Sequence, residues 1–104
     1  MITEQLKVLT SQVEGAIAEY YNIPIEEIRS NNTKSAATKA RHFSIYFLHT
    51  KYKLTCGQLG EIYKRSRHWL FDICRQMRNY AQVDARYRKE MSDLESILSC
   101  LCEE

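Results

Sequence analysis

The sequence predicts an all-α fold of about six helices with a central helix-turn-helix, within a single domain spanning residues 1–104. Apolar residues recur at steps of three or four along most of the chain, which is the periodicity of amphipathic helices. Only three glycines and one proline occur, so few positions interrupt a helix. A hydrophobic content of 44% and an aromatic content of 11% are too high for a disordered chain.

The first half of the chain predicts three helices. An apolar stripe runs along a helix from Thr3 to about Tyr21 and consists of Ile2, Leu6, Leu9, Val13 and Ile17. Pro24 opens a short helix that continues through Ile28, because proline is favoured at the first position of a helix. The polar residues 30–35 predict a loop. A third helix, residues 36–52, is apolar on nearly every side between 43 and 48, so we expect it at the centre of the domain.

The second half predicts the helix-turn-helix, at about residues 55–80. Thr55 and Gln58 have capping-box spacing and predict a short helix over residues 56–63. A turn at 64–66 follows, and Ser66 can cap a fifth helix. The core stripe of this helix is Leu70, Ile73, Cys74, Met77 and Ala81.

The last helix is expected to begin at about Asp84. Its apolar residues form one stripe, which consists of Tyr87, Met91, Leu94, Leu98 and Leu101. We expect this stripe to pack on the same domain, and a dimer or partner seam is the alternative.

Charge is segregated along the chain. The segment from Arg29 to Arg78 contains eleven Lys or Arg and only two acids, Glu61 and Asp72, whereas the flanks hold four bases and eleven acids. Clustered cations on helices favour a phosphate backbone, because their binding releases condensed counterions. The basic centre indicates nucleic-acid binding, although a solvated basic face without a partner has the same composition.

The fifth helix presents groove-reading residue types opposite its core stripe. At about 100° per residue, His68, Asp72, Arg75 and Asn79 lie on that face, with Arg67 at the helix start. Arg binds guanine bidentately and Asn does the same to adenine. The alternative is an ordinary solvent face in which Asp72 pairs with Arg75 or His68.

Other functional classes lack their motifs. The four cysteines and three histidines have no zinc-ligand spacing, so we expect neither a metal nor a cofactor. No paired nucleophile and base occurs, so we expect no enzyme activity. The phosphate-binding loop of nucleotide-driven enzymes is absent. No apolar run is long enough to span a bilayer, and the start lacks signal-peptide features, so we expect a cytoplasmic protein without membrane contacts.

Several segments together resemble a known family. They are Ala18–Ile23, Glu26–Ile28, Ala40–Leu48, Leu54–Gly60 and Cys74–Met77. Their order and residues are similar to the C-terminal DNA-binding domain of the bacterial chromosomal replication initiator, DnaA, over about Val13 to Leu98. The resemblance implies a helical domain related to the Trp-repressor type, which places a helix-turn-helix in the major groove of duplex DNA.

The resemblance implies a set of DNA contacts. Arg41, with Lys39 beside it, would contact phosphate at the start of the central helix. The family's minor-groove arginine falls at about Thr33, so that contact is missing unless Lys34 replaces it. Backbone N–H groups at Thr55 and Cys56 would approach phosphate. From charge and helical periodicity, rather than from the resemblance, we expect further phosphate contacts at Lys64 and Arg65. The major-groove set is Ser66, Arg67, His68, Trp69, Arg75 and Asn79.

The turn of the motif departs from the family pattern. Residues 64–69 are one residue shorter than the family's Gly-Gly-Arg-Asp-His-Thr-Thr, with Lys64 and Arg65 for the glycines and Trp69 for a threonine. The change implies retained DNA affinity and either a different sequence preference or none.

Two functions remain open. The first is double-stranded DNA binding, expected to be sequence-specific, that regulates replication initiation or transcription without an ATPase module. The second is a protein-interaction module that uses Trp69, Phe71 or the acidic last helix to bind a replication protein or a second copy. A monomer is the default, and a weak homodimer is the alternative.

Overall fold

The computed structural model describes residues 4–29 and 35–101, and these residues form helices without any strand. The helices are α1 (Glu4–Tyr21), α2 (Glu26–Arg29), α3 (Ser35–Thr50), α4 (Cys56–Tyr63), α5 (Arg67–Val83) and α6 (Ala85–Leu101). The all-α class is therefore confirmed. The predicted loop at 30–34, the start at residues 2–3 and the side chain of Leu101 lie outside the described part of the chain.

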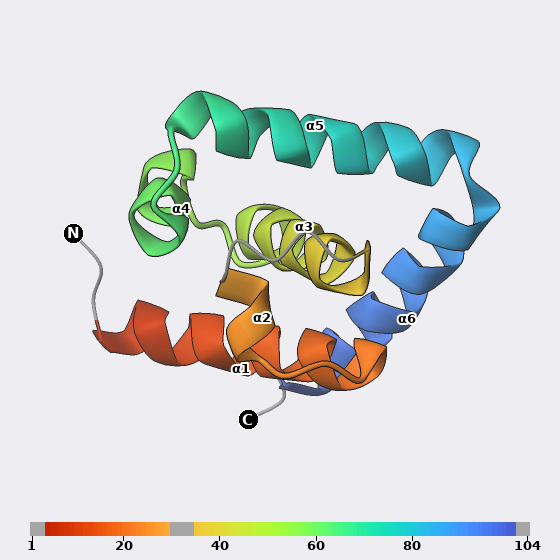
Figure 1. The fold of residues 1–104 in the computed structure, drawn as a ribbon, viewed down its shortest axis with the longest axis horizontal. Coiled ribbons are helices and arrows are strands. Elements are labelled where there is room, and N and C mark those ends of the chain that lie inside the picture. The colour runs from red at the N-terminus through yellow and green to blue at the C-terminus, as the bar shows by residue number, and fades with distance from the viewer. Residues whose placement is uncertain (1–3, 30–34, 102–104) are drawn as a thin grey trace.

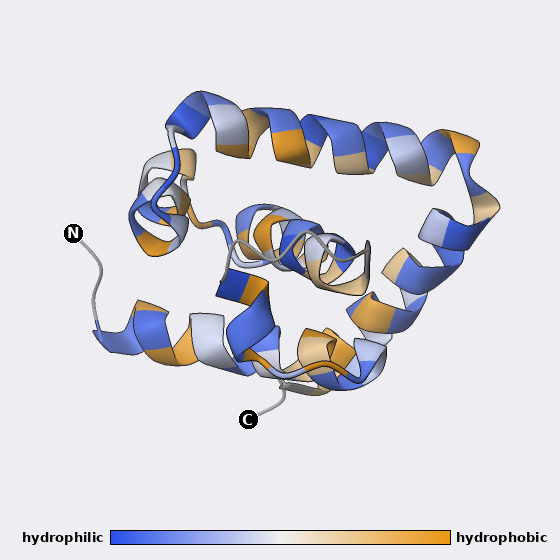
Figure 2. Ribbon diagram, viewed as in Figure 1, coloured by the Kyte–Doolittle hydropathy of each residue, from blue (hydrophilic) through white to orange (hydrophobic). Residues whose placement is uncertain are grey.

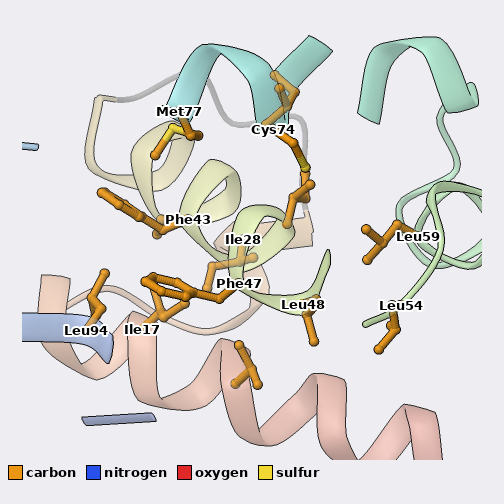
Figure 3. Close-up of a cluster of buried hydrophobic side chains, with 14 of the residues drawn as sticks. Ile17, Ile28, Phe43, Phe47, Leu48, Leu54, Leu59, Cys74, Met77 and Leu94 are labelled. Atoms are coloured by element: carbon orange, nitrogen blue, oxygen red, sulfur yellow. The ribbon is translucent and has the colours of Figure 1, made fainter. Parts of the chain in front are cut away.

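The central position predicted for the third helix is confirmed. α3 contacts α1, α2, α4 and α5, and Figure 1 shows it between α5 along the top and α1 along the bottom. Phe43, Phe47 and Leu48 of α3 lie in the buried cluster. They meet buried side chains from every neighbouring helix, which include Ile17, Ile28, Leu59, Met77 and Leu94 (Figure 3). Burying apolar surface on all sides of α3 is the main force that holds the other helices around it.

The structure corrects the ends of two predicted helices. The N–H groups of Glu27 and Ile28 bond three residues back, to Pro24 and Ile25, so the chain makes turns there and α2 begins only at Glu26. α3 ends at Thr50 rather than at residue 52. Lys53 adopts the left-handed conformation, with φ 67°, and the Leu54 N–H bonds back to the Leu48 carbonyl, which turns the chain away from the helix axis.

A buried carboxylate ties α4 to α1 and α2. Glu14 of α1 is 2% exposed. The Arg29 Nε donates to both of its oxygens, at 2.9 and 3.1 Å, and the Tyr63 hydroxyl donates to Oε2 at 2.6 Å. Burial, followed by the charge of Glu14, raises the pKa of Tyr63, so this hydroxyl keeps its proton. The three residues fix the end of α4, where the helix-turn-helix turn begins.

The last helix packs on the same chain, as expected. Leu94 and Leu98 are fully buried. The Tyr20 hydroxyl donates to Asp93 at 3.0 Å, and the Tyr21 hydroxyl donates to Glu90 at 2.6 Å. The acidic residues of α6 are thus partly used to bind α1, and its apolar stripe is buried at Leu94 and Leu98.

Candidate nucleic-acid interface

The turn between α4 and α5 is held by a left-handed residue and a glycine. Lys64 has φ 57° and ψ 48°, and its N–H donates to the Gly60 carbonyl. The Arg65 N–H donates to the same oxygen at 3.1 Å. A Cβ at position 60 would lie 2.7 Å from the Arg65 carbonyl oxygen, so only glycine fits without a shift of the backbone. The close approach fixes the direction in which Lys64 and Arg65 leave α4.

Both helices of the motif begin with the caps predicted from the sequence. Thr55 Oγ1 accepts from the Gln58 N–H at 3.1 Å, and the Thr55 N–H donates to Gln58 Oε1 at 2.9 Å. Ser66 Oγ accepts from the Trp69 N–H at 3.2 Å. The hydroxyls of Thr55 and Ser66 therefore serve their own helices, which sets where α4 and α5 start.

α5 separates its apolar and polar faces cleanly. Leu70, Ile73, Cys74 and Met77 are buried. The opposite face is hydrophilic in Figure 2 and contains the exposed residues His68, Arg75 and Asn79, while the exposed Arg67 lies at the helix start. Asp72 and Arg75 form the pair anticipated on a solvent face, at 3.4 Å with side chains 53% and 63% exposed. A pair this open contributes about 0.3 kcal/mol and does not prevent Arg75 from binding elsewhere.

Trp69 is half-buried and packs against the core. Its ring lies edge-on to His42, with ring centres 6.3 Å apart, and the Arg65 guanidinium lies over it at 5.2 Å from the ring centre. The tryptophan thus supports the start of α5 and holds Arg65 beside it. Burial, followed by the nearby charge of Arg41, lowers the pKa of His42.

Arg41 joins α3 to the end of α2. Its Nε donates to the Ile28 carbonyl at 2.6 Å and its Nη2 donates to the Glu27 carbonyl at 3.1 Å. Burial and then the nearby charge of Arg65 lower the pKa of Arg41. Arg41 is thus a structural clamp on the side of the molecule that carries the turn.

Lys39 faces a different partner. Its Nζ bonds to Glu90 at 2.9 Å and lies 4.4 Å from the centre of the Tyr87 ring, with 17% of the side chain exposed. Lys39 is therefore engaged with α6 rather than gathered with Lys64 and Arg65. Lys34 lies outside the described residues.

Known proteins share this helical motif. The model of the bacterial dnaA protein helix-turn-helix matches residues 10–81, which is more than half of the chain. The chain belongs to this family. It is 24% identical over 78 residues to the chromosomal replication initiator protein DnaA of Mycoplasma genitalium, and 32% identical over 50 residues to that of Mycoplasma pneumoniae. These alignments cover 75% and 48% of this chain but only 18% and 11% of the relatives.

Membership in the DnaA helix-turn-helix family assigns the chain to a class of DNA-binding domains. The family match includes the whole turn and α5 as far as residue 81. Among the described residues, no helix is long and apolar enough to cross a bilayer, and no three His, Cys, Asp or Glu lie close enough to hold a metal ion.

One exposed residue of this DnaA-type motif was not predicted as a DNA contact. Phe71 is 58% exposed and lines an open hollow of about 580 Å³ with Cys56, Arg67 and His68. The signal was present in the sequence, since Phe71 falls off the core stripe and about 40° from Arg67 around the helix axis. The hollow joins the start of α4 to the start of α5.

Proposed function

We propose that this chain binds double-stranded DNA by placing the N-terminal part of α5 in the major groove. The observation that carries the proposal is the exposed polar face of α5, which begins directly after the basic turn. His68, Arg75 and Asn79 are exposed on this face and Arg67 is exposed at the helix start, and these residue types read base edges. The buried stripe on the other side orients the face outward.

Phosphate contacts are proposed for the residues around the motif. Lys64 and Arg65 are exposed at the turn, where the backbone passes closest to α4. Of the two predicted backbone contacts, the Thr55 N–H donates to Gln58 Oε1, whereas the Cys56 N–H lies at the N-terminus of α4, which favours phosphate. Arg41 contributes its charge beside Arg65 while its donors bind the α2 carbonyls. Because Lys39 bonds to Glu90, we assign it a structural role and leave it out of the contact set.

Only some of the residues predicted to contact the major groove are placed to read bases. Ser66 uses its hydroxyl as a cap, and Trp69 packs against the core, so we propose that both position the helix rather than read bases. Arg67, His68, Arg75 and Asn79 remain as readers, which supports sequence-dependent binding. Because residues 64–69 depart from the pattern expected from the resemblance, we propose DNA affinity with either a different sequence preference or none.

The relatives are named chromosomal replication initiator proteins. We propose that this chain occupies or marks DNA sites that control replication initiation or transcription. The similarity supports this role through the DNA-binding part of the relatives alone, since the chain spans less than a fifth of their length.

Protein interaction remains the second candidate, and Phe71 is the observation that favours it. Two other surfaces considered for this role are used within the chain. Trp69 packs against the core, and the apolar stripe of α6 is buried at Leu94 and Leu98. This candidate predicts an interface that persists when the turn arginines are replaced.

Fluorescence anisotropy tests the proposal. The protein is titrated into a random-sequence duplex and a duplex that carries the initiator box, each at several salt concentrations. We expect salt-sensitive binding to both, because each phosphate contact releases counterions. Tighter binding to the box would indicate that the family's preference is retained, and equal binding would indicate a changed or absent one. Absence of binding to both duplexes at low salt would contradict the proposal.

A further inference from the structure

Phe71 is an exposed apolar side chain between polar residues near the start of α5. It is 58% exposed, although α5 already buries four side chains in the core. Leaving a phenylalanine ring in water forgoes the stabilisation that its burial would give. The ring therefore contributes little to the fold, and a contact made on binding would explain its position.

The hollow beside Phe71 is bordered by donors and cations. Its other lining residues are Cys56, Arg67 and His68. The Arg67 side chain extends back toward α4, since its Cδ is 3.7 Å from the position that a Cβ on Gly57 would occupy. Arg75 lies one turn further along α5, and Lys64 and Arg65 precede the helix. The Phe71 ring therefore lies in the same hollow as the Arg67 cation, which matches an anionic partner that presents small apolar groups.

Thymine in duplex DNA is such a partner. Its C5 methyl group projects into the major groove, next to the base-edge acceptors that arginine binds and close to the phosphates. The other three bases present no methyl group there. A protein partner with an apolar patch would fit Phe71 equally well, but the cations around the hollow favour a polyanion.

We infer that Phe71 is a specificity-determining residue that packs against a thymine methyl group in the major groove, while Arg67 binds the edge of a neighbouring base. The inference rests on the proposed DNA binding. Phe71 would thus supply the apolar base contact of α5. The protein would prefer duplexes in which thymine lies beside a base that offers hydrogen-bond acceptors to Arg67.

The test exploits the single methyl group that separates thymine from uracil. Anisotropy titrations use the duplex carrying the initiator box and a random-sequence duplex pool, each prepared once with thymidine and once with deoxyuridine. The wild-type protein should bind the thymidine form about fourfold more tightly for each methyl group that is buried. In the Phe71→Ala variant the two forms should bind equally.

Val83→Ala is the matched control. Val83 lies at the far end of α5 and is 81% exposed, so the variant also removes an exposed apolar side chain from the same helix. It should keep the wild-type preference for thymidine. Far-ultraviolet circular dichroism of each variant verifies that the helices are retained, which is expected because both side chains are exposed.

The outcomes separate the inference from the proposed function. Binding of duplexes without a preference for thymidine, or a preference that survives Phe71→Ala, would overturn the role of Phe71 and leave DNA binding intact. Absence of binding to all duplexes would overturn the proposed function itself. A preference unaffected by Phe71→Ala together with weakened self-association in sedimentation would assign Phe71 to a protein interface instead.

Discussion

Arg65 holds its charge at a defined place because its guanidinium lies over Trp69 and near Arg41. We expect Arg65→Ala to reduce the slope of log affinity against log salt by about 0.9, since one phosphate contact is lost. Arg65→Lys should keep the slope. The measurement is the salt series of anisotropy titrations.

Lys89→Ala provides the control for this prediction. Lys89 is an exposed cation on α6, and its removal changes the net charge by the same amount. A slope that falls equally for Lys89→Ala and Arg65→Ala would show that total charge, rather than a contact at the turn, sets the salt dependence.

His42 gives the protein a pH-dependent stability. Burial and the nearby Arg41 charge lower its pKa below 6.5 in the folded state. The unfolded chain then binds more protons than the folded chain below about pH 6.5, so this contribution to stability is present above that pH and decreases as the pH falls. Urea unfolding across this range should show the decrease, and His42→Gln should remove it. His68→Gln, which replaces an exposed histidine, should leave the decrease in place.

Individual charges were the least predictable residues. Their types suggested phosphate contacts, but the partners of Lys39 and Arg41 lie 51 and 13–14 residues away in the chain. No local pattern contains such pairings, because they arise only when α2, α3 and α6 pack together. The caps at Thr55 and Ser66 were predictable, since a cap bonds to a donor three residues ahead.

Among the elements, α4 contains two glycines, Gly57 and Gly60, that should respond oppositely to replacement by alanine. Gly60→Ala should destabilise the protein by about 1–3 kcal/mol, because the new Cβ would lie 2.7 Å from the Arg65 carbonyl oxygen and the turn must move. Gly57→Ala is the matched change in the same helix. Its Cβ would meet only ordinary contacts at 3.7 Å, and alanine is the better helix former by about 1 kcal/mol.

Urea unfolding measures the free energy of unfolding of both glycine variants. Anisotropy with duplex DNA reports whether each variant still binds DNA. Equal stabilities of Gly60→Ala and Gly57→Ala would contradict the close approach at the turn. Loss of DNA affinity in Gly60→Ala alone would support the turn geometry as a requirement for binding.

Periodic signals located the helices well and their ends less well. α4 and the start of α5 agree with the sequence because capping residues mark them. The end of α3 was placed two residues too far, since no glycine stands there and the left-handed position is occupied by Lys53. The start of α2 was placed too early, because a proline favours both a helix start and a turn.

For the molecule as a whole, the buried carboxylate of Glu14 connects three helices. Arg29→Ala should lower the free energy of unfolding by about 3 kcal/mol. The variant removes the cation that pairs with the buried Glu14 carboxylate and leaves it only the hydrogen bond from the Tyr63 hydroxyl. This value is at the low end of the range for breaking a buried ion pair, because the Arg29 side chain is 45% exposed. Lys89→Ala, which removes an ion pair with both side chains accessible, should change the stability little. Urea unfolding of the two variants compares them directly.

The overall site was predictable only in part. The basic turn and the outward face of α5 follow from charge and helical periodicity. The hollow between Cys56 and Phe71 does not, because it forms where α4 and α5 meet and depends on the angle set by Gly60.

The thiols of the described residues lie at different depths relative to this hollow. Cys74 is buried, and burial followed by the neighbouring Cys56 raises its pKa to about 11, so it is slow to react with an alkylating reagent. Cys100 is exposed on α6, far along the chain from the motif. Cys56 lines the hollow, where a bound duplex would shield it. Alkylation followed by mass spectrometry can therefore detect DNA binding in the wild-type protein. Bound duplex should reduce the alkylation of Cys56, and Cys100 serves as the internal reference.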